Sequence, residues 1–104
     1  MAYNAFAGDA YMKVVGRDVL TAFCSKHRDA LSWIEHWLAE AEDAKWKSPQ
    51  DIKLRYSSAS FLNGNRIIFN VKGNLYRLEV TVAYKTSTVV VEWAGSHADY
   101  DKRN

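Results

Sequence analysis

The sequence of 104 residues predicts an α+β fold, in which an N-terminal strand and two helices pack on a small, mainly antiparallel four-stranded sheet. Three observations predict this class. Apolar residues recur at helical spacing over the first half of the chain, and from Arg66 onward the spacing changes to alternation. The alternating segments are joined by only three residues, whereas parallel neighbours need a crossover of a dozen or more.

The first half of the chain is expected to form one strand and two helices. An apolar stretch at 12–15 ends at Gly16 and suits a strand. Asp18 can then cap a first helix, and Asp29 a second. Apolar residues mark the buried side of each helix, namely Val19, Leu20, Phe23 and Cys24 in the first and Leu31, Trp33, Ile34, Trp37, Leu38 and Ala41 in the second. We expect the tryptophans to pack this helix pair on the sheet.

A short third helix and three strands follow. Ser48 as cap, Pro49 in the first helical position and Asp51 in the third form a helix-start signature, so a short helix through Leu54 is expected. Residues 56–64 are rich in Ser, Asn and Gly without periodicity, which predicts a loop. The alternating segments predict strands at 66–71, 75–84 and 88–94.

Alternation assigns the strand side chains to two faces. The face that receives the helices is expected to carry Tyr76, Leu78, Val80 and Val82 from the middle strand and Val89, Val91 and Trp93 from the last. The opposite face is expected to carry Arg66, Ile68, Asn70, Arg77, Glu79, Thr81, Val90, Glu92 and Ala94. This second face is basic and amide-bearing, and His97 follows just beyond its edge.

Positive charge is concentrated in the second half of the chain. Residues 1–43 hold four Lys and Arg against seven Asp and Glu, whereas residues 44–104 hold ten against five. The basic half contains the polar face of the predicted sheet, so we expect this half to meet a polyanion. A solvated surface with randomly distributed charge is the structural alternative.

Composition limits the class and location of the protein. With 48% apolar and 25% charged residues, the chain has the length and composition of one globular domain. The single cysteine, Cys24, excludes an internal disulfide and is expected to be buried or half-buried in its helix. No apolar run approaches the roughly 20 residues that cross a bilayer. Because residues 1–11 also lack the features of a secretory signal, a cytoplasmic protein is expected.

Several residues of the basic half suit the cleavage of RNA. RNA can be cut without a metal when the ribose 2′-hydroxyl attacks the adjacent phosphate, which needs proton carriers and cations. His97 can carry the proton, and the planar fork of Arg77 can hold phosphate oxygens. Lys72, beside Gly73, can add a point charge. Tyr100 can stack on a base or donate a proton to the leaving oxygen.

Each of these residues also has a structural explanation. A histidine after a strand is commonly a hydrogen-bonded loop residue, and Arg77 can form ion pairs with Glu79, Glu92 or Asp101. Tyr100 can close the core, and Asn70 can satisfy the hairpin turn. Cys24, His27 and His36 do not match a known ligand spacing, so no metal site is expected. Without a glycine-rich phosphate loop or a serine-nucleophile motif, nucleotide hydrolysis and acyl transfer are not expected. No cofactor is expected.

Three short motifs occur in order along the chain. They are Trp46-Lys47-Ser48-Pro49, Phe69-Asn70-x-x-Gly73-Asn74-x-x-Arg77 and Ser96-His97-x-x-Tyr100-Asp101. In sequence and spacing they resemble the HigB toxin family of type II toxin-antitoxin modules, over about residues 12–102. The resemblance implies the RelE-like fold of the RelE/ParE superfamily, with one toxin domain at 12–104. Residues 1–11 then form an N-terminal extension that departs from the family pattern, and Met12 is an alternative start.

The resemblance also implies an activity, partners and a site. Similar toxins are endoribonucleases, or mRNA interferases, that commonly cut messenger RNA in the ribosomal A site. They are silenced by a HigA antitoxin with a helix-turn-helix, through which the complex reaches operator DNA. By position, the active-site group is Arg77, His97 and Tyr100, and the residues near the RNA are Asn70, Lys72 and Asn74. Further attraction to the RNA backbone is expected from Lys53, Arg55, Arg66 and Lys102.

A second class of function stays open on the sequence. The superfamily also contains toxins that bind DNA gyrase, so a non-catalytic protein that binds gyrase or RNA is the alternative. The pair of His97 and Tyr100 beside Arg77 favours RNA cleavage, because a protein that only binds does not require a proton carrier.

Overall fold

The computed structural model describes residues 10–103. In chain order, its strands and α-helices are β1 (Lys13–Val15), α1 (Arg17–Lys26), α2 (Leu31–Glu42), α3 (Pro49–Arg55), β2 (Ser60–Leu62), β3 (Arg66–Val71), β4 (Tyr76–Ala83), β5 (Thr88–Ser96) and α4 (His97–Arg103). Short 3₁₀ turns occur at Arg28–Ala30, Asn63–Asn65 and Tyr84–Thr86. Apart from Ala10 and Tyr11, the predicted N-terminal extension lies outside the described residues.

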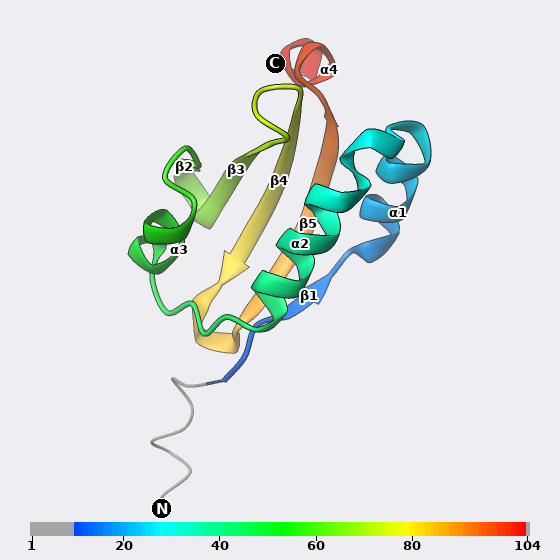
Figure 1. The fold of residues 1–104 in the computed structure, drawn as a ribbon. Coiled ribbons are helices and arrows are strands. Elements are labelled where there is room, and N and C mark those ends of the chain that lie inside the picture. The colour runs from blue at the N-terminus through cyan, green and yellow to red at the C-terminus, as the bar shows by residue number, and fades with distance from the viewer. Residues whose placement is uncertain (1–9, 104) are drawn as a thin grey trace, which may run out of the picture.

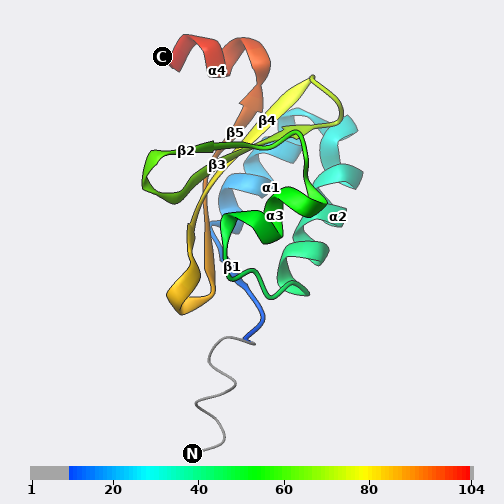
Figure 2. The same ribbon diagram turned by 90° about the vertical axis from the view of Figure 1, so that its left-hand side faces the viewer.

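The strands form one sheet in the order β1-β5-β4-β3-β2. Strands β2 to β5 are antiparallel to their neighbours, and β1 runs parallel to β5. Helices α1, α2 and α3 lie on one face of this sheet, while α4 leaves the end of β5 on the other side (Figures 1 and 2). The predicted α+β class and mainly antiparallel sheet are confirmed. We call the face without α1, α2 and α3 the outer face.

The sheet has one strand more than predicted. Residues 56–64 were expected to form a loop, but Ser60–Leu62 within them pair with Arg66–Ile68 of β3. The connection between these strands turns at Gly64 and Asn65, which both have positive φ. A three-residue strand is too short to show alternation, and its Ser, Asn and Gly neighbours indicate only a turn.

The core lies between the sheet and the helical layer. Its largest fully buried side chains are Trp37, Phe69, Ile52, Ile67 and Leu78. Trp37 of α2 packs edge-on against Phe69 of β3, with ring centroids 5.5 Å apart. Trp33 is half-buried beside Tyr56. The tryptophans therefore pack α2 on the sheet as predicted.

Two of the three predicted helix caps are wrong. Helix α1 begins after Gly16, so Asp18 lies in its first turn. Asp29 lies in the 3₁₀ turn before α2, where its carboxylate accepts a hydrogen bond from the Tyr76 hydroxyl. The local sequence pattern predicts a cap at each of these two aspartates, but the helix boundaries in the folded protein place neither of them in the cap position. At α3 the predicted order holds, with Ser48 in the cap position and Pro49 at the start of the helix.

A β-bulge corrects the predicted faces of β5. Val80 pairs with Val91 but Glu79 pairs with Trp93, so Glu92 is an additional residue in β5. Beyond the bulge the side chains exchange faces. Trp93 therefore lies on the outer face with Glu79, and the prediction that it faces the core is wrong. Ala94, predicted on the outer face, packs against the core instead. An inserted residue cannot be detected from alternation alone.

The backbone conformation at residue 16, directly before α1, predicts that glycine is required there. Gly16 has a φ of 89°, and a Cβ atom there would lie 2.6 Å from the backbone oxygen of Val91. We expect Gly16→Ala to lower the free energy of unfolding by about 2–4 kcal/mol, from left-handed strain and overpacking together. Urea unfolding measures this loss.

Gly64 supplies the matched control for that substitution. It also has a positive φ, 74°, but a Cβ atom added there would meet no other atom within 4 Å. Gly64→Ala should therefore cost only the strain, about 1 kcal/mol. Equal losses for the two variants would show that the close approach of Gly16 to β5 has no energetic consequence.

Candidate active site

The three residues predicted to form the active-site group meet on the outer face. Arg77 extends from β4, and His97 and Tyr100 extend from α4. Nη2 of Arg77 lies 2.6 Å from Nε2 of His97. The guanidinium carbon of Arg77 lies 4.7 Å from the centroid of the Tyr100 ring, a cation–π distance. A cation, an imidazole and a phenol therefore form one cluster, which we call the Arg77 cluster.

Strand pairing positions this cluster. Arg77 lies directly opposite Gly95 of β5, and β5 ends one residue later, where α4 begins. The backbone N–H of His97 donates to the carbonyl of Leu75 at 3.2 Å, which fixes the start of α4 beside the β3–β4 connection. The sequence pattern predicts no helix over residues 97–103, so α4 is a finding of the structure.

The hydrogen bond between Arg77 and His97 indicates which ring nitrogen of the imidazole is the acceptor. A guanidinium has only donors, so Nε2 of His97 is the acceptor and the ring proton is on Nδ1. Oδ2 of Asp101, one helical turn later, lies 3.5 Å from Nδ1. The carboxylate thus faces the Nδ1 proton. In this arrangement the lone pair of Nε2 is directed at Arg77 and can accept a proton once Arg77 releases it.

The Arg77 cluster is open to solvent on one side. The His97 side chain is 39% exposed, so it is not sealed beneath the helices. Arg77 is half-buried, and its Nε is a buried donor without a partner in the described part of the chain. A buried donor without a hydrogen bond costs roughly 1–3 kcal/mol. Arg77 also forms no ion pair with Glu79, Glu92 or Asp101 among residues 10–103.

A second group of residues holds α4 against the sheet. Glu79, only 5% exposed, accepts a hydrogen bond from Nη1 of Arg103 at 2.8 Å. Its other oxygen lies 3.6 Å from Nη1 of Arg66. The Arg103 guanidinium lies 4.6 Å from the centroid of a Trp93 ring, and that ring packs against Tyr100. We call Glu79, Arg103 and Trp93 the α4 clamp.

Sequence reasoning did not identify the α4 clamp. The predicted polar face includes Glu79, but a single acidic residue on a basic face does not by itself indicate a distant arginine as its partner. The bulge places Trp93 on the face opposite to the one that alternation predicts. The residue that could have indicated the clamp is Arg103. It follows the Ser96-His97-x-x-Tyr100-Asp101 motif closely enough for its long side chain to reach back over the sheet.

Three of the predicted RNA-binding residues lie on or beside the outer face. Asn70 is the cross-strand partner of Arg77, and its amide donates to the carbonyl of Ser58 at 3.4 Å. Arg66 is on the same face of β3 and contacts Glu79. Lys102 is exposed on α4. Of the three, Asn70 lies directly beside Arg77, Arg66 lies further along the same face, and Lys102 adds a cation on α4.

The other four predicted RNA-binding residues are not drawn into the cluster. Nζ of Lys72 lies 3.4 Å from Asp29, and Asn74 is exposed in the β3–β4 connection. Nζ of Lys53 donates to the carbonyl of Ala59, and Arg55 pairs with Glu40 at 2.7 Å.

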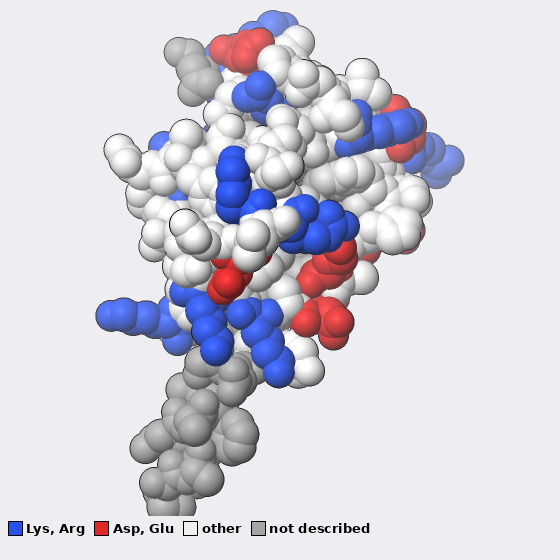
Figure 3. Space-filling view, turned by 60° about the vertical axis from the view of Figure 1, so that its left-hand side comes forward, with Lys and Arg blue, Asp and Glu red and all other residues white. Residues whose placement is uncertain are grey.

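Acidic neighbours divide the basic surface near α3. Along the side of the molecule that carries β2 and α3, lysine and arginine form separate groups with acidic residues between them (Figure 3). The ion pair of Arg55 with Glu40 belongs to this side. Because each acidic group repels phosphate, the cations here attract RNA less strongly than an unbroken basic patch would.

The carboxylates of the helical layer are held by tyrosines. The Tyr56 hydroxyl donates to Glu40 at 2.5 Å, and this bond, together with Arg55, lowers the pKa of Glu40. In the same way the Tyr76 hydroxyl lowers the pKa of Asp29, with a smaller contribution from Lys72. Burial and Glu40 raise the pKa of Tyr56. These networks fix α2 and its preceding turn to the sheet.

Comparison with known proteins defines the class. A family model described as HigB toxin, the RelE-like toxic component of a toxin-antitoxin system, matches residues 30–103. The match covers more than half of the chain and includes β4, β5 and α4, which carry the Arg77 cluster. The fold and the match thus define a RelE-like toxin, a class that implies an antitoxin partner.

The chain belongs to the HigB toxin family. This membership confirms the resemblance and the RelE-like fold expected from the sequence motifs. A comparison with curated proteins found no match. Within residues 10–103, the structure has no helix that is both long enough and apolar enough to span a membrane.

The α4 clamp predicts a measurable loss of stability. Glu79→Ala leaves Arg103 without its carboxylate partner on a largely buried site. Because the arginine side chain is 37% exposed, we expect a loss of only about 1–3 kcal/mol in urea unfolding. Amide hydrogen exchange in α4 should accelerate. Glu92→Ala is the control, since Glu92 is exposed and bonded only to Thr81 in the described structure. Equal losses of unfolding free energy for the two variants would contradict the proposed role of the α4 clamp.

The lowered pKa of Glu40 predicts a pH-dependent contribution to stability. Its folded pKa lies below the ordinary value of 4.5, so the contribution is present above that pH and is lost as the pH falls through the folded value. The side chain is 39% exposed, which limits the effect to below about 1 kcal/mol. The difference in unfolding free energy between the parent and Glu40→Gln should therefore shrink from pH 6 to pH 3. Glu35→Gln, in the same helix, is the control, and a constant difference would contradict this account.

Proposed function

We propose that this toxin is an endoribonuclease that cleaves messenger RNA by metal-independent attack of a ribose 2′-hydroxyl on the adjacent phosphate. The observation that supports this function best is the Arg77 cluster, in which a cation, an imidazole and a phenol lie together on an exposed surface. Attack by the 2′-hydroxyl needs one group to take a proton, one to stabilise charge on the phosphate and one to protonate the leaving oxygen. The three residues match these three requirements.

His97 is the proton acceptor in this proposal. Its Nε2 now accepts a hydrogen bond from Arg77. A bound phosphate competes for the guanidinium, so Nε2 becomes available to take the proton of the 2′-hydroxyl. The Nδ1 proton stays directed at Asp101, whose charge stabilises the imidazolium that forms.

Arg77 and Tyr100 complete the reaction. Arg77 donates two hydrogen bonds to the non-bridging oxygens, which gather negative charge as the 2′-oxygen bonds to phosphorus. The bond from phosphorus to the 5′-oxygen breaks, and the Tyr100 hydroxyl gives its proton to that oxygen. The products are a 2′,3′-cyclic phosphate and a free 5′-hydroxyl, and proton exchange with His97 and solvent restores the tyrosine.

The residues around the cluster would hold the RNA strand. Asn70 lies beside Arg77 and offers an amide to a base or a phosphate. Arg66 and Lys102 supply attraction to the backbone, which falls steeply with salt concentration. Lys53, Arg55, Lys72 and Asn74 lie outside the cluster, so we assign them to flanking nucleotides.

The small size of the protein suggests that it needs help to position its substrate. A domain of 104 residues has little surface with which to orient a flexible RNA strand. We therefore propose that cleavage takes place in the cytoplasm on message held by the ribosome. A HigA-type antitoxin with a helix-turn-helix would be the partner and would connect the complex to operator DNA.

Removing the imidazole tests this function directly. His97→Ala should reduce the rate of message cleavage in a translating extract by about 10²–10⁴-fold, the usual contribution of a general acid–base group. Mapping of the cleavage ends measures the rate. His36→Ala is the control, because His36 is exposed on α2 and its Nδ1 contacts only the Ser32 carbonyl in the described structure.

The outcome also separates cleavage from binding alone. If His97→Ala cuts message as fast as the parent, His97 has no part in the reaction. If both proteins arrest growth without cutting message and instead produce DNA damage, the alternative of a gyrase-directed toxin is correct.

A further inference from the structure

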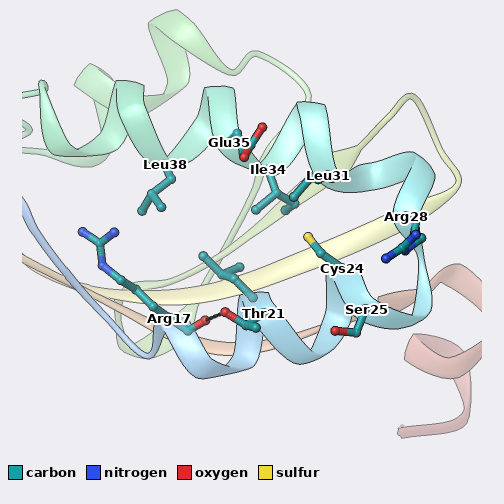
Figure 4. Close-up of a pocket in the computed structure, with 10 residues that line it drawn as sticks. Arg17, Thr21, Cys24, Ser25, Arg28, Leu31, Ile34, Glu35 and Leu38 are labelled. Atoms are coloured by element: carbon teal, nitrogen blue, oxygen red, sulfur yellow. Dashed lines mark hydrogen bonds between the residues drawn. The ribbon is translucent and has the colours of Figure 1, made fainter.

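A groove runs between α1 and α2 (Figure 4). These two helices lie on one face of the sheet, and α4, which carries His97 and Tyr100, lies on the other side (Figure 2). The groove has a volume of about 670 Å³. Its residues come only from these two helices and the turn that joins them. Those from α1 and the turn are Arg17, Leu20, Thr21, Cys24, Ser25 and Arg28, and those from α2 are Leu31, Ile34, Glu35 and Leu38. This groove has no part in the proposed reaction.

The middle of the groove is apolar. Leu31 is 45% exposed, Leu38 and Cys24 are half-buried, and Leu20 and Ile34 are buried beneath them. In Figure 4, Leu31, Ile34 and Leu38 extend from α2 toward Cys24 and Thr21 of α1. An exposed leucine over an apolar channel is the pattern of a surface that is covered by a partner.

The ends of the groove carry arginines. Arg17 at one end is paired with Glu42. Arg28 at the other end is exposed and has no ion-pair partner among residues 10–103. Glu35 also lines the groove, from α2. A ligand that fills the groove is therefore expected to be mainly apolar, with an acidic group at the end near Arg28 and none beside Glu35.

An amphipathic α-helix matches the length and the lining of this groove. Helix α1 has ten residues, so the groove extends for about 15 Å, or nearly three helical turns. A convex amphipathic helix with anchors at i, i+4 and i+7 fills such a channel.

We propose that the α1–α2 groove is the docking site for an amphipathic helix of the antitoxin, with an acidic residue of that helix at Arg28. The occupant follows from the family, because the toxic component of a toxin-antitoxin system has a protein that must recognise it. This inference rests on the antitoxin partner of the proposed function but not on RNA cleavage. Binding at the groove and chemistry at the Arg77 cluster then use opposite faces of one sheet.

Cys24 allows the proposal to be tested on the unmodified chain. It is the single cysteine, and its half-buried thiol lines the groove. Burial and the nearby Glu35 raise its pKa, so labelling is done at mildly alkaline pH. The probe is N-ethylmaleimide, and the partner is the adjacent-gene product whose co-expression restores growth. Saturation with this antitoxin should slow alkylation of Cys24 at least tenfold.

Two matched variants test the same surface by affinity. Leu31→Asp introduces a charge into the groove, and Leu54→Asp introduces one on α3, where the leucine is 87% exposed. Titration calorimetry should show antitoxin binding weakened at least tenfold for Leu31→Asp and unchanged for Leu54→Asp. Both variants should still arrest growth, but only the Leu54→Asp protein should be neutralised by co-expressed antitoxin at its normal level.

Three results would overturn the proposal. They are an unchanged rate of Cys24 alkylation in the saturated complex, equal antitoxin affinity for the two variants, and protection of Cys24 in the free toxin in step with dimer formation. The last result would identify a second copy as the occupant. None of these measurements depends on RNA cleavage, so failure of the groove proposal and failure of the nuclease proposal are distinguishable.

Discussion

The ion pair between buried Glu79 and Arg103 is the interaction on which the candidate active site depends. A seven-residue helix has little stability of its own in water, so α4 needs tertiary contacts to persist. The ion pair and the stacking of Arg103 on Trp93 provide these contacts on the outer face. His97 stands on the first turn of that helix, so the distance between its imidazole and Arg77 is set by the attachment of α4.

The bulge in β5 makes this attachment possible. If β5 continued in regular alternation through Glu92, without the bulge, Trp93 would point into the core and Arg103 would lose its contact with the indole. With the bulge, the indole lies across Gly95, where a Cβ atom would be 2.7 Å from the ring. The absence of a side chain at Gly95 thus serves both the stacking of Trp93 and the freedom of Arg77 opposite it. The bulge thus changes the outer face from a plain polar surface into a second, small packing layer.

The sequence predicted the features that depend on local spacing and missed those that depend on distant contacts. Strand β3 was predicted at its observed bounds, and Trp37 packs on the sheet as expected, because alternation and helical spacing record which side chains are buried. Strand β2 and helix α4 were missed, since their short polar segments become regular only through pairing or docking. The meeting of Arg77 with His97 was anticipated from motifs and strand faces, but the contact of Glu79 with Arg103 spans 24 residues and leaves no periodic signal.

The separation of the α1–α2 groove from the Arg77 cluster by a full sheet has an evolutionary consequence. Substitutions at Leu31 or Arg28 alter a surface that contributes no atom to the proposed chemistry. Under the proposed docking, changes at this surface would alter which antitoxin the toxin accepts while leaving the proposed catalytic residues as they are. Such a protein is suited to the formation of insulated pairs, in which duplicated modules cease to cross-neutralise after a few changes on the helical side.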